Sequence, residues 1–175
     1  MKIYLLRHEK RYNDRGFDTE LTDEGFLDSV ILKDKLLRLN IDKIYCSPYK
    51  RVIQTLEPFL QESNKSVNPE YGVYESLHLD NDSGNIREIN NKLYGYNYFN
   101  YQYESVVNKD DLSYGETFED IKLRSNKVIT NLLNDKDNIN KTILIACHWS
   151  VINAILNREE KYPFEMGEIK LFYDD

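Results

Sequence analysis

Short apolar runs alternate with longer segments of helical spacing along much of the chain. Residues 3–6 and 141–147 are the clearest runs, and residues 41–46 and 168–173 are further strand candidates. Runs of this length are typical of buried strands in a parallel sheet, because helices cover such a sheet on both faces. The pattern predicts an α/β fold of three layers, a doubly wound and mostly parallel sheet with helices on both faces.

A first helix is expected after a polar loop at residues 13–20. Thr22 can cap the free amides of its first turn, and Asp23 lies where the helix dipole favours negative charge. Helical spacing continues to about Leu39. The apolar residues that keep this spacing are Phe26, Leu27, Val30, Ile31 and Leu37.

Later segments carry similar helix signals. Ser47-Pro48 predicts an N-cap and a first-turn proline for a helix over residues 48–62. Thr117, with an acidic residue three positions later, predicts another capped helix, and Arg124 falls on its apolar stripe. Residues 149–156 have the pattern of a last helix.

The size and composition fit a single domain over residues 1–175. With 175 residues, 41% of them apolar, the chain can fill one core. Residues 76–115 have no clean period and include the aromatic tract from Tyr94 to Tyr103, so they are a candidate cap or lid insertion. An equally good alternative is a partly helical excursion whose tyrosines pack on the main body.

The charge and the apolar pattern exclude some partners. A net charge of -7 would repel nucleic acid and anionic membranes. No apolar run is long enough to span a bilayer, and no signal peptide is recognisable, so a cytoplasmic protein is expected. Cys46 and Cys147 each end an apolar run and are expected to be reduced and buried. The oligomeric state stays open.

Three of the predicted strands end on residues that can do chemistry. Arg7 and His8 follow the first run, Ser47 and Arg51 follow the second, and His148 follows residues 141–147. Ligands of open parallel sheets bind beyond the carboxyl ends of the strands. Two arginines, two histidines and a helix amino terminus at one sheet edge would form a cationic pocket suited to a phosphoryl group.

The order of motifs resembles that of a known family. The motifs are Leu6-Arg7-His8, Leu21-Thr22-x-x-Gly25, Cys46-Ser47-Pro48-x-x-Arg51-x-x-Gln54-Thr55, Gly115-Glu116-Thr117 with Arg124, and His148 after an apolar strand. Together they resemble the histidine phosphatase superfamily, also called phosphoglycerate mutase-like. The resemblance covers nearly the whole chain.

The resemblance implies a role for each matching position. His8 matches the nucleophile that becomes phosphohistidine, and Arg7, Arg51 and His148 match the phosphate-binding residues. Glu75 matches the acidic proton donor. A neutral imidazole is a competent nucleophile near pH 7, and arginine forks suit the charge of the transition state, so no metal or other cofactor is needed. The substrate would be a small-molecule or protein phosphomonoester.

Some positions depart from the family pattern or are less certain matches. Glu9 stands where the family commonly has glycine, and a carboxylate there would oppose phosphate binding unless it points away or pairs with a cation. Asn13 roughly matches an asparagine that lines the family's pocket, one position out of register. Glu70 is the second candidate for the acidic proton donor. Arg124 is expected to be structural rather than a ligand.

Three functions are compatible with these residues. The leading one is metal-independent hydrolysis of phosphomonoesters. A mutase would need more basic residues and a closing lid, whereas residues 76–115 contain only Arg87, Lys92 and Lys109 as basic residues. The third is a non-catalytic phosphate- or phosphoprotein-binding module in which Glu9 has abolished the chemistry.

Overall fold

A five-stranded mixed sheet forms the centre of the protein, and its strand order is β3-β2-β4-β1-β5. The computed structural model describes residues 1–14, 16–77, 97–112, 114–158 and 163–175. The strands are β1 (Lys2–Arg7), β2 (Lys43–Cys46), β3 (Asn68–Pro69), β4 (Thr142–Cys147) and β5 (Ile169–Asp174). The first four are parallel, and β5 runs antiparallel to β1 at the edge. The predicted mostly parallel α/β sheet is therefore confirmed.

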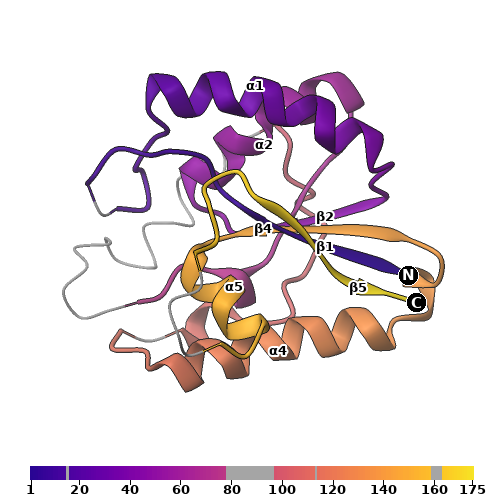
Figure 1. Ribbon diagram of the computed structural model, residues 1–175. Helices are drawn as coiled ribbons and strands as arrows, with labels where there is room; N and C mark the ends of the chain where they lie inside the picture. The colour runs from indigo at the N-terminus through magenta and orange to yellow at the C-terminus, as the bar shows by residue number, and fades with distance from the viewer. Residues whose placement is uncertain (15, 78–96, 113, 159–162) are drawn as a thin grey trace.

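Helices cover both faces of the sheet (Figure 1). The helices α1 (Asp23–Arg38) and α2 (Lys50–Ser63) pack together on one face. The other face carries α4 (Phe118–Asn134) and α5 (Trp149–Ile155). Short 3₁₀ helices are η1 (Tyr71–Val73), η3 (Lys109–Asp111) and η4 (Lys136–Asn138). The three layers agree with the prediction.

The two central strands show why their sequences are continuously apolar. Leu144 and Ala146 of β4 belong to the core cluster under α1 and α2, whereas Ile143 and Ile145 belong to the cluster under α4 and α5. Successive side chains of a strand point to opposite faces, so a strand covered on both faces needs apolar residues at every position. Because each strand alternates in this way, the register between β1 and β4 fixes where the last residues of the two strands lie.

The predicted helix α1 is confirmed, and Leu37 packs partly buried against the core, but most of the other apolar residues of helical spacing face outward. Phe26, Leu27, Val30 and Ile31 are 38%, 68%, 51% and 63% exposed. The buried face instead consists of Gly25, Ser29, Leu32 and Leu36. A Cβ on Gly25 would lie 2.1 Å from the carbonyl oxygen of Lys10. Because the helix starts directly against this backbone, small residues occupy the buried positions of its first turns, and the apolar residues beside them face outward.

The predicted cap of α2 is also wrong. The helix begins at Lys50, and its N-cap is Tyr49, whose side chain makes no capping hydrogen bond. The amide of Ser47 still donates to the carbonyl of Ala146 at 2.9 Å, so the sheet ladder continues through Ser47 and frees its side chain for another partner. By contrast, Thr22 accepts from the Gly25 amide as predicted, and Thr117 forms the predicted capping box.

Two further predictions have different outcomes. Cys46 and Cys147 are free and buried, as predicted. The candidate lid at 76–115 stays a prediction, because residues 78–96, including Tyr94, lie outside the described residues. Within the part of the chain that the structure describes, no helix is long and apolar enough to cross a membrane.

Candidate active site

The carboxyl ends of three parallel strands bring the predicted residues to one edge of the sheet. His8 follows β1, Ser47 follows β2 and His148 follows β4. Arg7 pairs with Cys147 in the sheet register, so the two histidines leave neighbouring strands at the same level. Their ring centroids are 5.3 Å apart. The fold thus assembles a group that is spread over 140 residues of sequence.

His8 is held in one tautomer. Its Nδ1 lies 2.8 Å from the carbonyl oxygen of Glu9, which can only accept a hydrogen bond, so Nδ1 carries the proton. Nε2 is then free to accept and lies 3.3 Å from Nε of Arg51. Burial, the neighbouring His148 and the Arg51 cation lower the pKa of His8 well below its ordinary value. The ring is therefore neutral at pH 7, with an unprotonated Nε2.

Arg51, the second residue of α2, lies among the other functional side chains. Its Nη1 donates to the carbonyl oxygen of Gly16 at 3.0 Å. Its Nη2 lies 3.3 Å from Oε2 of Glu75 and 3.3 Å from Nδ1 of His148. The guanidinium thus faces both histidines and the carboxylate, and it is almost entirely removed from solvent.

His148 is fully buried between a hydroxyl and a carboxylate. Its Nε2 lies 2.8 Å from Oγ of Ser47. Its Nδ1 lies 3.2 Å from Oε2 of Glu75 as well as close to Arg51. Since Arg51 can only donate and an ionised Glu75 can only accept, Nδ1 satisfies one of them at a time. Burial and Arg51 lower the pKa of His148 well below its ordinary value.

Glu75 closes the group from the loop after η1. Its Oε1 accepts from the Ser76 amide at 3.0 Å and from the hydroxyl of Ser150. Burial raises the pKa of Glu75, but Arg51 and the hydrogen bonds from Ser150 and Ser76 outweigh this effect, so the pKa is lowered overall. Glu75 is therefore ionised in the unliganded site.

A buried ion pair holds the loop that carries Glu75. Nε of Arg124 donates to Glu116 at 2.6 Å, and its two other nitrogens donate to the carbonyl oxygens of Gly72 and Glu75 at 2.9 and 3.2 Å. Glu116 also accepts from the amide of Leu77 at 3.0 Å. Arg124 thus has the structural place expected of it. Its position on an apolar stripe indicates a buried partner, and that partner is Glu116, which no sequence pattern identifies.

Two hydroxyls take part in the site. Ser47 lies at the predicted strand end but caps no helix, and Ser150 is not singled out by any sequence pattern. Each lies within two residues of the end of a buried strand or of a candidate histidine, and this proximity was the available signal. Both hydroxyls orient a group in the site, Ser47 the ring of His148 and Ser150 the carboxylate of Glu75.

Arg7 and Asn13 lie differently. Nη1 of Arg7 donates to the carbonyl oxygen of Phe164, and its buried Nε has no hydrogen-bond partner among the described residues. Asn13 lies in the exposed loop before α1, and no contact found within the described residues joins its side chain to the group. The loop contributes the Gly16 carbonyl instead.

Glu9 is buried beside the nucleophile candidate, with 5% of its surface exposed. Its carboxylate lies against Gly167 in the turn before β5. Burial and the nearby Asp28 raise the pKa of Glu9 to about 7, and Lys10 and Lys35 oppose the shift.

Metal ligands are also present in the site. His8, Glu75 and His148 offer one ligand atom each, all within 4.8 Å of one another. The Arg51 guanidinium faces the same three atoms within 3.3 Å. A metal ion there would have to displace this cation or remain beside it, so the surroundings of the three ligands do not fit a resident metal.

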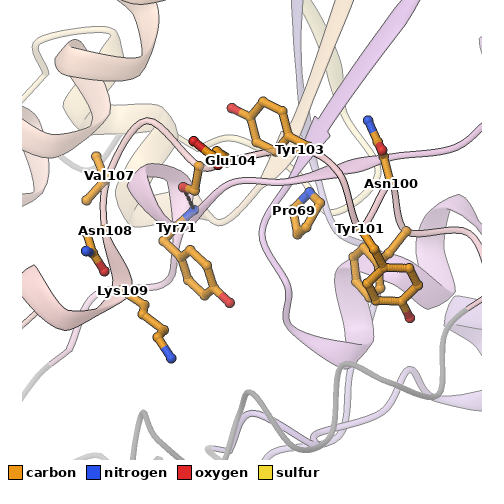
Figure 2. Close-up of a pocket in the computed structure, with 11 residues that line it drawn as sticks. Pro69, Tyr71, Asn100, Tyr101, Tyr103, Glu104, Val107, Asn108 and Lys109 are labelled. Carbon is orange, nitrogen blue, oxygen red and sulfur yellow. Dashed lines mark hydrogen bonds between the residues drawn. The ribbon is translucent and has the colours of Figure 1, made fainter.

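A separate cavity of about 520 Å³ lies between β3, η1 and residues 99–109. Figure 2 shows the rings of Tyr71 and Tyr101 with Pro69 between them. Glu70 is buried next to this region, and its carboxylate accepts hydrogen bonds from Tyr103 and Ser105 at 2.6 and 2.7 Å. Part of the predicted aromatic tract thus lines a pocket, while Glu70, the second candidate for the acid, binds to the backbone and hydroxyls around it.

Comparison with known proteins agrees with this geometry. The model of the histidine phosphatase superfamily (branch 1) matches residues 3–171. A Schizosaccharomyces pombe protein named as a probable phosphatase is 30% identical, with 97% of this chain and 80% of that protein covered.

Two solved structures share the fold. Bacillus stearothermophilus YhfR superposes with a TM-score of 0.71 at 20% identity and covers 99% of this chain and 91% of its own. A mycobacterial glucosyl-3-phosphoglycerate phosphatase in complex with inorganic phosphate has a TM-score of 0.62 at 19% identity and covers 89% of this chain and 76% of its own. With the family model matching nearly every residue, the chain belongs to the histidine phosphatase superfamily and is a phosphatase of that type.

Proposed function

We propose that the protein hydrolyses phosphomonoesters through a covalent phosphohistidine on His8. The observation that carries the proposal is the tautomer of His8. The Glu9 carbonyl holds the proton on Nδ1, which leaves a neutral, buried Nε2 beside Arg51. This arrangement is that of an oriented nucleophile next to a cation that can bind the group under attack.

In the first step Nε2 of His8 forms a bond to phosphorus while the ester P–O bond breaks. The transition state spreads negative charge over the equatorial oxygens, so a fixed cationic clamp supplies most of the rate. Arg51 and the unpartnered Nε of Arg7 are the candidates for that clamp. His148, 3.3 Å from Arg51, would complete it.

Glu75 is the proposed proton donor to the leaving oxygen. In the unliganded site Arg51 contributes to the lowered pKa of Glu75. An entering phosphoryl group takes over Arg51 and adds negative charge, and both changes raise the pKa of Glu75. Glu75 then carries a proton only when the substrate is bound, and it gives that proton to the alkoxide as the P–O bond breaks.

The second step reverses the proton transfer. Water attacks the phosphorus of phosphohistidine, Glu75 accepts the proton of that water, and the N–P bond breaks. The products are inorganic phosphate and neutral His8. No metal takes part in either step.

The substrate class that fits best is a small phosphorylated metabolite. A mycobacterial protein that shares the fold is named for glucosyl-3-phosphoglycerate, a small phosphorylated metabolite. Hydrolysis is favoured over a mutase reaction, because among the described residues Arg7 and Arg51 are the arginines that lie next to the strand ends, and they suffice for one phosphoryl group. We place the protein in the cytoplasm.

The test combines turnover with trapping of the intermediate. With an aryl phosphate in EDTA, wild-type protein is expected to turn over and His8→Asn to be inactive. Rapid acid-free quenching should trap one base-stable, acid-labile phosphoryl group, which peptide mapping places on His8. His148→Asn is the matched control, since it weakens the clamp but keeps the nucleophile, so its adduct forms slowly at the same position.

Two results would overturn the proposal. One is wild-type turnover that survives His8→Asn. The other is an adduct on a residue other than His8. Absence of turnover by wild-type protein against a panel of sugar phosphates between pH 5 and 8 would support the binding-module alternative instead.

A further inference from the structure

Glu9 occupies the space that a side chain at position 167 would need. A Cβ built on Gly167 would lie 1.9, 2.8 and 2.4 Å from Oε1, Oε2 and Cδ of Glu9. Gly167 has φ +69°, in the left-handed region where glycine is favoured. The glutamate and the glycine are therefore complementary in shape, a large side chain against a position without one.

The backbone of Glu9 is tied to the reacting groups on both sides. Its carbonyl oxygen accepts from Nδ1 of His8 at 2.8 Å. Its amide donates to Oγ1 of Thr55 at 2.9 Å, and that hydroxyl donates to the carbonyl of Arg51 at 2.8 Å. The position of residue 9 thus affects both the imidazole ring of His8 and the turn of α2 that carries Arg51.

The turn around Gly167 holds the same stretch of backbone. The amide of Gly167 donates to the carbonyl oxygens of Arg7 and His8 at 3.1 and 3.3 Å, and the Arg7 amide donates to Glu168 at 3.2 Å. The amide of Glu168 donates to the carbonyl of Glu165 at 3.1 Å, which closes the turn. The turn that contains Gly167 is therefore hydrogen-bonded directly to the backbone of Arg7 and His8.

We propose that Glu9 is a positioning residue, whose side chain, seated on Gly167, fixes its own carbonyl and so aims Nε2 of His8 at the phosphoryl group. This inference rests on the proposed nucleophilic role of His8. It also gives a function to the residue that departs from the family's usual glycine. Gly167 has no side chain, and the side chain of Glu9 fills the space beside it.

A four-member set of variants tests this fit. In Gly167→Ala the new methyl group takes the space of the buried Glu9 carboxylate, so the Glu9 side chain has to leave its position on residue 167. Because Glu9 then no longer holds its own carbonyl in place, kcat is expected to fall by about 10- to 100-fold with KM nearly unchanged. Glu9→Ala alone leaves a gap and is expected to lower kcat by a few-fold. In the double variant Glu9→Ala with Gly167→Ala the collision is absent, but the left-handed φ still strains alanine at position 167, so kcat is expected to return to within a few-fold of wild type while Tm stays lowered.

Asn140→Ala is the matched control for backbone strain. Asn140 also has a left-handed φ, +62°, but it is exposed and precedes the amino end of β4, at the opposite edge of the sheet. Its replacement is expected to lower Tm slightly and to leave kcat per active site unchanged. Folded protein is quantified in each variant by circular dichroism, so loss of folded protein does not count as loss of kcat.

The outcomes separate this inference from the function on which it depends. If wild-type turnover does not require His8, the proposed function fails first. If turnover requires His8 but Gly167→Ala keeps its kcat, or if Glu9→Ala does not restore the Gly167→Ala enzyme, the positioning role is wrong. A Gly167→Ala protein that loses Tm only, as Asn140→Ala does, would show that the pair stabilises the fold and nothing more.

Discussion

Glu70 and Glu75 are five residues apart, and both are partly or wholly buried, yet they have different surroundings. Glu70 is 0% exposed and accepts five hydrogen bonds from the amides of Gly72, Val106 and Val107 and the hydroxyls of Tyr103 and Ser105. The Glu75 side chain is 22% exposed and faces a guanidinium and an imidazole.

The difference lies in what the partners can do when a ligand arrives. The donors around Glu70 are neutral backbone amides and hydroxyl groups of the protein itself. Their hydrogen bonds to Glu70 hold residues 103–107 against η1, and a ligand does not compete for them. The partners of Glu75 are a cation and a histidine that a phosphate could also bind, so a ligand can replace them. Burial alone therefore does not identify a catalytic carboxylate; a displaceable partner does.

Glu75→Gln should lower the turnover rate more than any other variant considered below changes its own property. An amide cannot give a proton to the leaving oxygen, so kcat for alkyl phosphates should fall by about 10²- to 10⁴-fold. Aryl phosphates, whose leaving groups need no proton, should slow far less. Steady-state kinetics with a series of leaving groups measures this. Equal slowing of both classes would remove Glu75 from the role of acid.

The next largest effect is on the stability of Glu70→Gln. The amide nitrogen would face backbone amides that also donate, which leaves buried donors unsatisfied at a cost of about 1 to 3 kcal/mol each. The free energy of unfolding in urea should fall accordingly, with kcat per folded molecule nearly unchanged. Tyr103→Phe removes one of the five hydrogen bonds and is the milder control. A large loss of kcat in Glu70→Gln would erase the contrast with Glu75.

Glu9 is another buried carboxylate, and its effect on the free energy of unfolding depends on pH. Burial and Asp28 raise its folded pKa to about 7, above the unfolded value near 4.5, so the folded state favours the protonated form. Wild-type protein therefore loses stability as pH rises from about 4.5 to 7, whereas Glu9→Gln does not titrate. The variant should gain on wild type across that window, by up to about 3 kcal/mol. Urea unfolding at pH 5 and pH 8 measures this, and an equal difference at both pH values would contradict it.

The smallest expected effect is on the titration of Glu75 in Ser150→Ala. The Ser150 hydroxyl stabilises the charged carboxylate, so its removal should raise the pKa of Glu75. Carbon NMR of the side-chain carboxyl groups in the unliganded protein follows the shift directly. Thr117→Ala, at the exposed start of α4, is a hydroxyl control that should leave Glu75 unchanged. A lowered pKa in Ser150→Ala would mean that the hydroxyl does not favour the charged form.

Elements that repeat a simple pattern could be predicted from the amino-acid sequence alone. Continuous apolar runs identified β1 and β4, because a strand buried on both faces has no polar position. Capping chemistry located the starts of α1 and α4, because Thr22 and Thr117 act within a few residues. The order of strand ends brought His8, Arg51 and His148 to one edge, since parallel strands place their carboxyl ends together.

The folded structure was needed for every feature that depends on contacts between distant segments. It assigned Ser47 to His148 instead of a helix cap, turned Leu27 and Ile31 of α1 outward, and placed Glu75 rather than Glu70 beside Arg51. It also seated Glu9 on Gly167, 158 residues away. Local patterns cannot fix such pairs, because each depends on which backbone a side chain meets after the chain has folded.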